Sequence, residues 1–208
     1  LAAIAEDQGF EYELQSLGWD AGVAAVQAGQ ADALIAGATI KPVLDLAPAA
    51  VIVPMVNNAQ DAEAAVRACR YPVDGGERGF ATRRATGYDR DPLAGYLELS
   101  RKEPRVFVQI EHREAVRNID DILKVEGIGG VCIGPCDLSA SYGKTGCFED
   151  PEVSDAIDLV REKTLAAGVL RGGFCAGSFW SDRFMNWKAI GSDVSILAAA
   201  TRRLIGKK

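Results

Sequence analysis

The chain has 208 residues, 48% of them hydrophobic and 25% charged, so it is long enough to bury one substantial core. Its formal net charge of -6 and isoelectric point near 4.9 disfavour a nucleic-acid-binding surface. No apolar run reaches the roughly 20 residues that cross a bilayer, so we expect no membrane partner and a cytoplasmic protein. Residues 1–208 are predicted to form a single domain.

The first half of the chain alternates segments typical of strands with segments typical of helices. Strands are predicted at residues 10–17, 33–36 and 50–55, and helices at residues 21–30 and 59–69. The stretch from Tyr71 to Asp91, rich in glycine and arginine, is predicted to be a long loop. Loops of that length in a compact domain usually have a function.

Two carboxylates follow the next two predicted strands. Glu111 ends Arg105-Val-Phe-Val-Gln-Ile-Glu, and Asp137 lies just past Gly130-Val-Cys-Ile-Gly-Pro-Cys. Residues 113–124 between them are polar and permit a helix, so the strands should be parallel and both acids should lie at the carboxyl-terminal edge of one sheet. Two hard oxygen ligands at that edge suit Mg²⁺ or Mn²⁺. The alternative is that each acid caps the helix that follows it.

The remaining elements continue the alternation of strands and helices. Helices are predicted at residues 151–167, 182–187 and 194–204, and strands at residues 169–175 and 188–190. Together with the earlier segments, this pattern predicts an α/β fold like a (β/α)8 TIM barrel. The five cysteines form no C-x-x-C pair, which argues against a disulfide framework or a zinc site.

The residues around the two acids resemble a known family. Val108-Gln-Ile-Glu111, followed by Val125-Glu-Gly-Ile-Gly-Gly-Val-Cys-Ile-Gly-Pro-Cys-Asp-Leu-Ser-Ala-Ser141, is similar to the HpcH/HpaI family of class II, metal-dependent pyruvate aldolases. Val53-Pro-Met-Val-Asn-Asn58, residues 64–72 and Arg78-Gly79 extend the resemblance, which covers about residues 43–208. It implies a barrel whose first strand is missing here, with Glu111 and Asp137 as ligands of Mg²⁺ or Mn²⁺.

The resemblance also implies a site for a small 2-oxo acid such as pyruvate. The backbone N–H groups of Cys136 and Asp137, at the start of a short helix, are expected to hold its carboxylate, because helix N-termini present unpaired donors. Gln109 is expected to face the same pocket as a catalytic residue. Arg78, as a further catalytic residue, and Tyr88, as a substrate contact, are assigned to the rim from the long loop. A solvated role in that loop is the alternative for both.

The N-terminal segment departs from the aldolase pattern. Residues 9–41 resemble a β-α-β unit of periplasmic amino-acid-binding proteins, which predicts a chimera with an atypical unit at residues 1–42 and an aldolase-like barrel portion at residues 43–208. Thr39 matches the ligand clamp of those proteins, but residues 40–44 supply no arginine. A solute-binding site is therefore not predicted. Chance similarity of an amphipathic segment is the alternative.

Two groups that the aldolase family uses are missing from their expected positions. The family has a catalytic histidine after its second strand, where this chain reads Gly18-Trp-Asp20, and an arginine after its third, where this chain has Lys41. The chain's single histidine, His112, should point away from Glu111, because side chains alternate along a strand. Lysine-based Schiff-base catalysis at Lys41, Lys124 or Lys188 is a minor alternative.

Two functional classes therefore stay open. The first is a metal-dependent carbon–carbon lyase, an aldolase acting on 2-oxo acids through a pyruvate enolate, with turnover weakened by the missing base and arginine. The second is a non-catalytic α/β chimera or scaffold that retains the metal motif. The family resemblance further implies a homo-oligomer.

Overall fold

The computed structural model describes residues 40–80, 84–89, 93–174, 186–189 and 193–206. Three predicted elements, the strands at residues 10–17 and 33–36 and the helix at residues 21–30, lie outside these ranges. The same holds for nearly all of the predicted helix at residues 182–187. The fold below is that of the described residues.

Within the described ranges, five parallel strands form one sheet. They are β1 (Ala50–Val53), β2 (Arg105–Ile110), β3 (Ile128–Ile133), β4 (Leu170–Phe174) and β5 (Trp187–Ala189). Their order in the sheet is their order in the chain. Sequential parallel strands are the arrangement of a (β/α)8 barrel, whereas a doubly wound sheet reverses its strand order.

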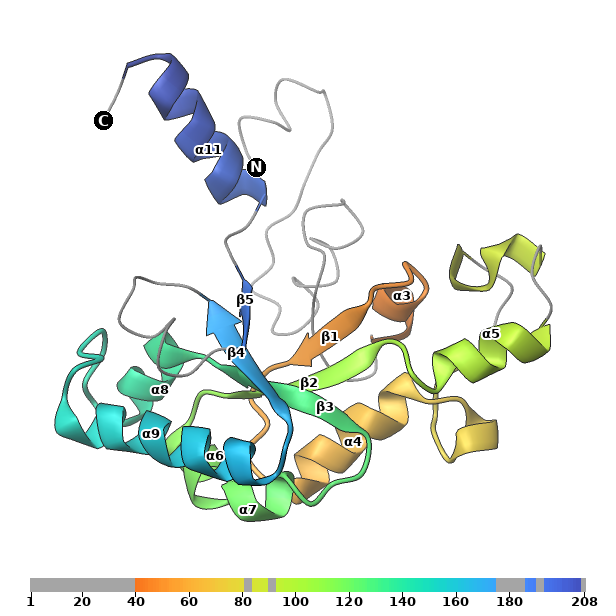
Figure 1. Cartoon of the computed structure of the whole chain (residues 1–208), viewed down its shortest axis with the longest axis horizontal. Helices are drawn as coiled ribbons and strands as arrows, with labels where there is room; N and C mark the ends of the chain where they lie inside the picture. Colours follow the sequence, from red (N-terminus) through yellow and green to blue (C-terminus); the bar gives the residue numbers. More distant parts are fainter. Residues whose placement is uncertain (1–39, 81–83, 90–92, 175–185, 190–192, 207–208) are drawn as a thin grey trace, which may run out of the picture.

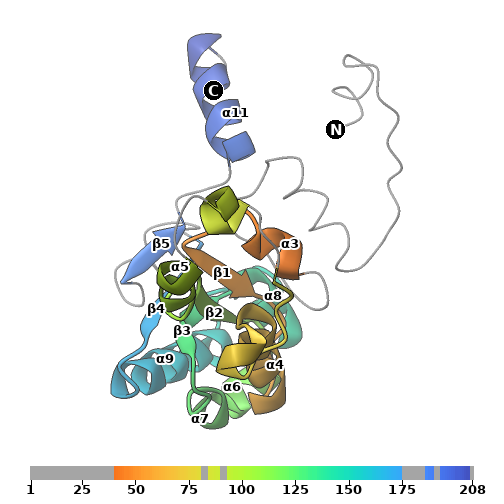
Figure 2. The same cartoon turned by 90° about the vertical axis from the view of Figure 1, so that its right-hand side faces the viewer.

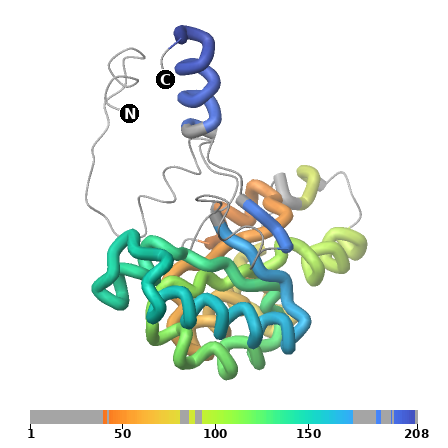
Figure 3. The backbone as a smooth tube through the Cα atoms, turned by 60° about the vertical axis from the view of Figure 1, so that its left-hand side comes forward, coloured from red at the N-terminus to blue at the C-terminus, as the bar shows by residue number. Residues whose placement is uncertain are grey.

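α4 (Ala59–Cys69), α6 (Arg113–Arg117), α7 (Ile119–Ile122) and α9 (Pro151–Ala166) gather on one side of the sheet, below it in Figures 1 and 2. α4 contacts β2, α9 contacts β4, and α7 touches both helices. The other helices are α3 (Ile40–Leu44), α5 (Leu93–Ser100), α8 (Pro135–Ser141) and α11 (Asp193–Leu204), with short 3-10 turns η2 (Pro72–Asp74) and η3 (Arg84–Asp89). α11 stands apart from this body in the tube view (Figure 3).

The sheet is curled and carries helices on one side. It is a half-barrel, which agrees with the predicted TIM-barrel class. Completion of the barrel stays a prediction. The core lies between the sheet and its helices, where alternate residues of β2, including Val106, Val108 and Ile110, are fully buried. Ile119 and Ile122 of α7 and Ile157 of α9 pack into the same cluster.

Local sequence signals fix the helix starts. The side chain of Asn58 accepts a hydrogen bond from the N–H of Asp61 and caps α4. Asp150 caps α9 in the same way, through the N–H of Glu152, and Pro151 occupies the first helical turn, where its missing N–H costs nothing. The predicted helices at residues 59–69 and 151–167 are confirmed, the second ending one residue early.

Three expectations need correction. The stretch 113–124 is two short helices, because Asn118 ends α6 with a non-helical backbone and its side chain donates to the carbonyl of Asn57. Trp187, expected at the end of a helix, begins β5. α5 was not predicted at all. None of the helices in the described ranges has both the length and the apolarity that a bilayer crossing requires.

Candidate metal and substrate site

Three chain segments meet at the carboxyl-terminal edge of the sheet. Met55 follows β1, Glu111 follows β2, and Gly134 follows β3 and leads into α8, whose first turn contains Asp137. The parallel register pairs Val53 with Val108 and Ile110 with Ile133, so β2 and β3 end level and β1 ends two residues earlier. The predicted placement of both acids at one edge is therefore what the structure shows.

The side chain of Glu111 is held by two hydrogen-bond donors. The backbone N–H of Met55 donates to Oε1 at 2.7 Å, and Nε2 of Gln109 donates to Oε2 at 2.5 Å. The residue is 4% exposed. Gln109 was expected to face the substrate pocket. In the structure its side chain contacts the carboxylate of Glu111.

Burial raises the pKa of Glu111 above its ordinary value. The hydrogen bonds from Met55 and Gln109 oppose this, while the neighbouring Asp137 raises the pKa further through its charge and a hydrogen bond. Two carboxylates in contact, one of them buried, carry negative charge that no nearby cation in the described ranges neutralises. Hard oxygen donors with excess negative charge are what Mg²⁺ and Mn²⁺ select, so the residues fit a divalent cation.

The pair would leave most of a cation's coordination positions open. No third histidine, cysteine, aspartate or glutamate joins the two acids within the part of the chain that the structure describes. Octahedral ions of this kind often keep several water molecules and take oxygen atoms from a substrate. The arrangement therefore suits a cation that also binds a small oxygen-rich ligand.

The turn into α8 lies next to both acids. Cys136 and Asp137 are exposed in its first turn, where backbone N–H groups have no partner within a helix. The turn is fixed from behind, because the hydroxyl of Ser139 donates to the carbonyl of Cys136 and accepts from the N–H of Gly146. Because Cys136 and Asp137 are exposed, their N–H groups could receive a carboxylate.

Arg78 and Tyr88 do not lie at this edge. Arg78 is 3% exposed, donates to the carbonyl of Leu44 at 3.2 Å, and stacks over the ring of Tyr71. Leu44 precedes β1, so these contacts are at the opposite, amino-terminal edge of the sheet. Tyr88 is 66% exposed in η3, which contacts α5 ahead of β2. Neither residue is carried into the catalytic set proposed below.

The lysines considered for Schiff-base chemistry are paired with acids. Lys41 forms an ion pair with Asp45 at 2.7 Å, and Lys124 pairs with Asp121 at 2.8 Å. The hydrogen bond that Lys124 donates to Asp121 raises the pKa of Lys124, the direction opposite to the one that frees a nucleophilic amine. The structure gives no support to that alternative at these two positions.

His112 has a structural task. Its Nδ1 accepts a hydrogen bond from the N–H of Glu114 at 3.2 Å, so the imidazole caps α6. We expect His112→Ala to lower the free energy of unfolding by about 1 kcal/mol, the usual cost of a lost cap, while Mn²⁺ affinity stays unchanged. His112→Asn, which retains a capping side chain, is the control in denaturant unfolding. A loss of Mn²⁺ affinity in both variants would contradict a purely capping role.

The four cysteines in the described ranges divide into two classes of reactivity. Burial raises the pKa of Cys69 to about 11 and that of Cys132 to about 12, whereas Cys136 and Cys147 are exposed. Iodoacetamide at pH 8 should therefore label Cys136 and Cys147 and spare the buried pair, as read by peptide mass spectrometry. Mn²⁺ with pyruvate should slow labelling of Cys136 and leave that of Cys147 unchanged. Equal protection of both would argue against a ligand beside α8.

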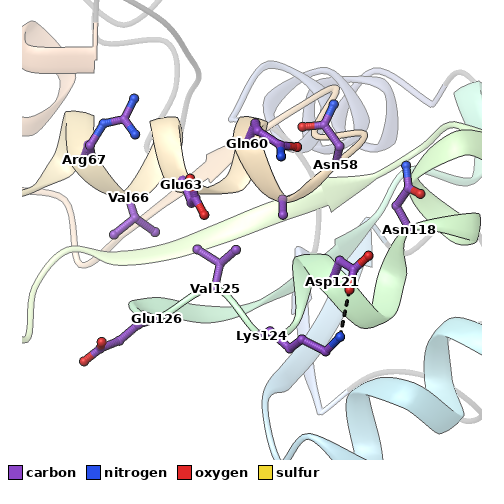
Figure 4. Close-up of a pocket in the computed structure, with 11 residues that line it drawn as sticks. Asn58, Gln60, Glu63, Val66, Arg67, Asn118, Asp121, Lys124, Val125 and Glu126 are labelled. Atoms are coloured by element: carbon purple, nitrogen blue, oxygen red, sulfur yellow. Dashed lines mark hydrogen bonds and ion pairs between the residues drawn. The ribbon is translucent and has the colours of Figure 1, made fainter.

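A further groove lies away from the two acids. It has a volume of about 890 Å³ and runs between α4 and the segment from Asn118 to Glu126, as Figure 4 shows. Its walls mix polar and apolar side chains, and Lys124 and Asp121 form an ion pair on one of them. It opens in the helical layer outside the sheet and contains neither acid of the pair. We assign no chemistry to it.

Comparison with known proteins points to one family. The model of the HpcH/HpaI aldolase/citrate lyase family matches residues 17–198. A 4-hydroxy-2-oxo-heptane-1,7-dioate aldolase of Shigella sonnei is 40% identical over 173 residues, covering 81% of this chain and 65% of that protein. The match thus spans less than two thirds of that relative's length.

Solved structures agree with these matches. An HpcH/HpaI aldolase from Desulfitobacterium hafniense DCB-2 is 26% identical with a TM-score of 0.74, over 98% of this chain and 85% of that one. A family protein from Burkholderia cenocepacia J2315 is 28% identical with a TM-score of 0.71, over 80% and 67%. The family match begins at residue 17, inside the segment expected to be foreign. The comparisons do not show a chimera, which stays a prediction.

Proposed function

The chain belongs to the HpcH/HpaI aldolase/citrate lyase family, and we propose that it is a metal-dependent carbon–carbon lyase acting on 2-oxo acids through the enolate of pyruvate. The observation that supports this most is the contact between the buried Glu111 and Asp137 at the carboxyl-terminal edge of the sheet. The relative's name suggests 4-hydroxy-2-oxo acids as the substrate class.

The bond changes define what the site must stabilise. In the cleavage direction the 4-hydroxyl group loses its proton, the bond between C3 and C4 breaks, and C4 becomes the carbonyl carbon of an aldehyde. The electron pair stays on the pyruvate fragment as its enolate, and a proton added at C3 gives pyruvate. A divalent cation held by Glu111 and Asp137 would supply a Lewis acid for this negative charge.

The chain's own residues would then divide the remaining work. Gln109 and the N–H of Met55 orient Glu111. The N–H groups of Cys136 and Asp137 would receive the carboxylate of the 2-oxo acid, because the first turn of a helix presents unpaired donors. The proposal keeps two expectations: a cytoplasmic protein and a homo-oligomer.

Proton transfer is the weak point of this site. A positioned general base commonly contributes about 10² to 10⁴-fold in rate, yet the single histidine is engaged as a helix cap. We therefore propose slow turnover for this chain. Because His112 is engaged as a cap, a non-catalytic scaffold that retains the metal motif stays open as the second candidate function.

The exchange of pyruvate methyl protons in deuterated water tests both candidates without knowing the aldehyde. With Mn²⁺, the chain should bind pyruvate, seen as a change in the relaxation of water protons, and should exchange its protons only a few-fold faster than Mn²⁺ alone. Asp137→Asn should weaken both effects at the same Mn²⁺ concentration. A scaffold would give neither effect in the original chain. Fast exchange that His112→Ala removes would overturn slow turnover and make His112 the base.

A further inference from the structure

Met55 combines three features at the edge of the proposed site. Its N–H contacts Glu111 directly, its backbone has a φ of 53°, and its side chain is 47% exposed. The sequence pattern singled out none of them, since the residue was expected simply to end a strand. β1 ends at Val53, two residues before Met55.

The backbone conformation is unusual for this residue type. Left-handed φ values crowd the Cβ atom of any residue other than glycine, and only Ala47 and Tyr88 share the property among the described non-glycine residues. A glycine would present the same N–H to Glu111 without that strain. Strained backbone at a site edge is a reason to look for a use of the side chain.

Exposure alone assigns nothing, because this chain exposes several large apolar side chains, such as Leu99 and Leu165. Met55 differs from them because its own backbone touches the buried member of the acid pair. Its side chain therefore begins next to that acid and is about half exposed. A flexible, polarisable side chain there suits apolar groups of varied shape.

We propose that Met55 is a specificity residue, whose side chain forms an apolar wall for the carbon chain beyond C3 of a bound 2-oxo acid. This rests on the proposed function, which supplies the ligand. It adds a preference: 2-oxo acids with a short apolar chain should bind better than pyruvate. Burying each methylene group against such a wall strengthens binding by up to about fourfold.

Binding of pyruvate and 2-oxopentanoate to the Mn²⁺-loaded chain tests this, read from water-proton relaxation and needing no turnover. The original chain and Met55→Leu should prefer 2-oxopentanoate, by up to about 15-fold for its two extra methylene groups. Met55→Ala and Met55→Gly retain the backbone N–H and should lose most of that preference, expressed as the ratio of the two affinities within each variant. Leu165→Ala, which truncates an equally exposed side chain on α9, is the matched control.

The outcomes separate the two proposals. Equal preference in the original chain and in Met55→Ala, with pyruvate bound by both, would overturn the role of Met55 alone. Failure of the original chain to bind pyruvate or Mn²⁺ would refute the proposed function and the specificity role with it. Thermal unfolding without metal gives an independent readout, because Met55→Gly should be at least as stable as Met55→Ala if the backbone is strained.

Discussion

Replacing Asp137 by asparagine is expected to weaken Mn²⁺ binding by about 100-fold. The change removes one of two charged oxygen ligands, and the affinity of such sites follows the number of charged ligands. At a Mn²⁺ concentration of 100 times the original Kd, the metal should stabilise the original chain by about 2.7 kcal/mol, against about 0.4 kcal/mol for the variant. Calorimetry and thermal unfolding measure both quantities. Unchanged affinity would remove Asp137 from the proposed site.

Stability without metal shows that the variant is not simply unfolded. Asp137 helps to raise the pKa of Glu111 in the folded chain, after the larger effect of burial. A raised folded pKa means that the contribution of Glu111 to stability is fully present below its ordinary pKa of 4.5 and is lost as the pH rises through the folded value. The metal-free variant should therefore be more stable than the original chain at pH 7, with the difference vanishing near pH 4. Asp155→Asn on α9 is the exposed control.

The sequence predicted the site residues best where the parallel arrangement of the strands alone decides where a residue lies. A strand, a crossover helix and a second parallel strand must bring the residues after both strands to one edge, which is why the adjacency of Glu111 and Asp137 could be predicted. The helices at residues 59–69 and 151–167 were equally predictable, because their caps and periodicity are local. The remaining site residues depend on contacts between distant segments.

Arg78 illustrates an error that topology could have prevented. A helix that follows a parallel strand runs back across the sheet, so the chain leaving α4 starts from the amino-terminal edge. Arg78 comes nine residues after Cys69, the last residue of α4, and its N–H bonds to the carbonyl of Arg70. The glycine-rich composition of the loop suggested function but gave no information on which edge it occupies.

Met55 and Asn118 show what sequence patterns could not supply. The left-handed backbone of Met55 is maintained beside a carboxylate 56 residues away, and the break between α6 and α7 is fixed by a carbonyl 61 residues away. Neither residue type predicts such a role, because methionine rarely adopts a positive φ and asparagine is common in many turns. Both features become visible only when β1 and β2 lie side by side.

Gly134 is the tightest point of the proposed site. Its backbone lies between β3 and α8, and a Cβ atom added there would be 2.7 Å from Nε2 of Gln109 and 2.7 Å from Oε2 of Glu111. Its φ of -103° is ordinary for any residue, so crowding and not backbone strain requires glycine. The absence of a side chain lets the turn into α8 approach the carboxylate and its amide partner.

Gly134→Ala should therefore damage both stability and metal binding. Forcing a methyl group into this packed contact should lower the free energy of unfolding by about 2 kcal/mol, and displacing Gln109 from Glu111 should weaken Mn²⁺ binding by about 10- to 100-fold. Gly95→Ala is the matched control: Gly95 lies in α5 with no atom within 4 Å of an added Cβ, so alanine there should leave Mn²⁺ affinity unchanged and stabilise the helix by up to about 1 kcal/mol. Denaturant unfolding and calorimetry on both variants measure these effects. If Gly134→Ala were destabilised but bound Mn²⁺ as tightly as the original chain, the Glu111 carboxylate would not be a ligand in the position that the structure gives it.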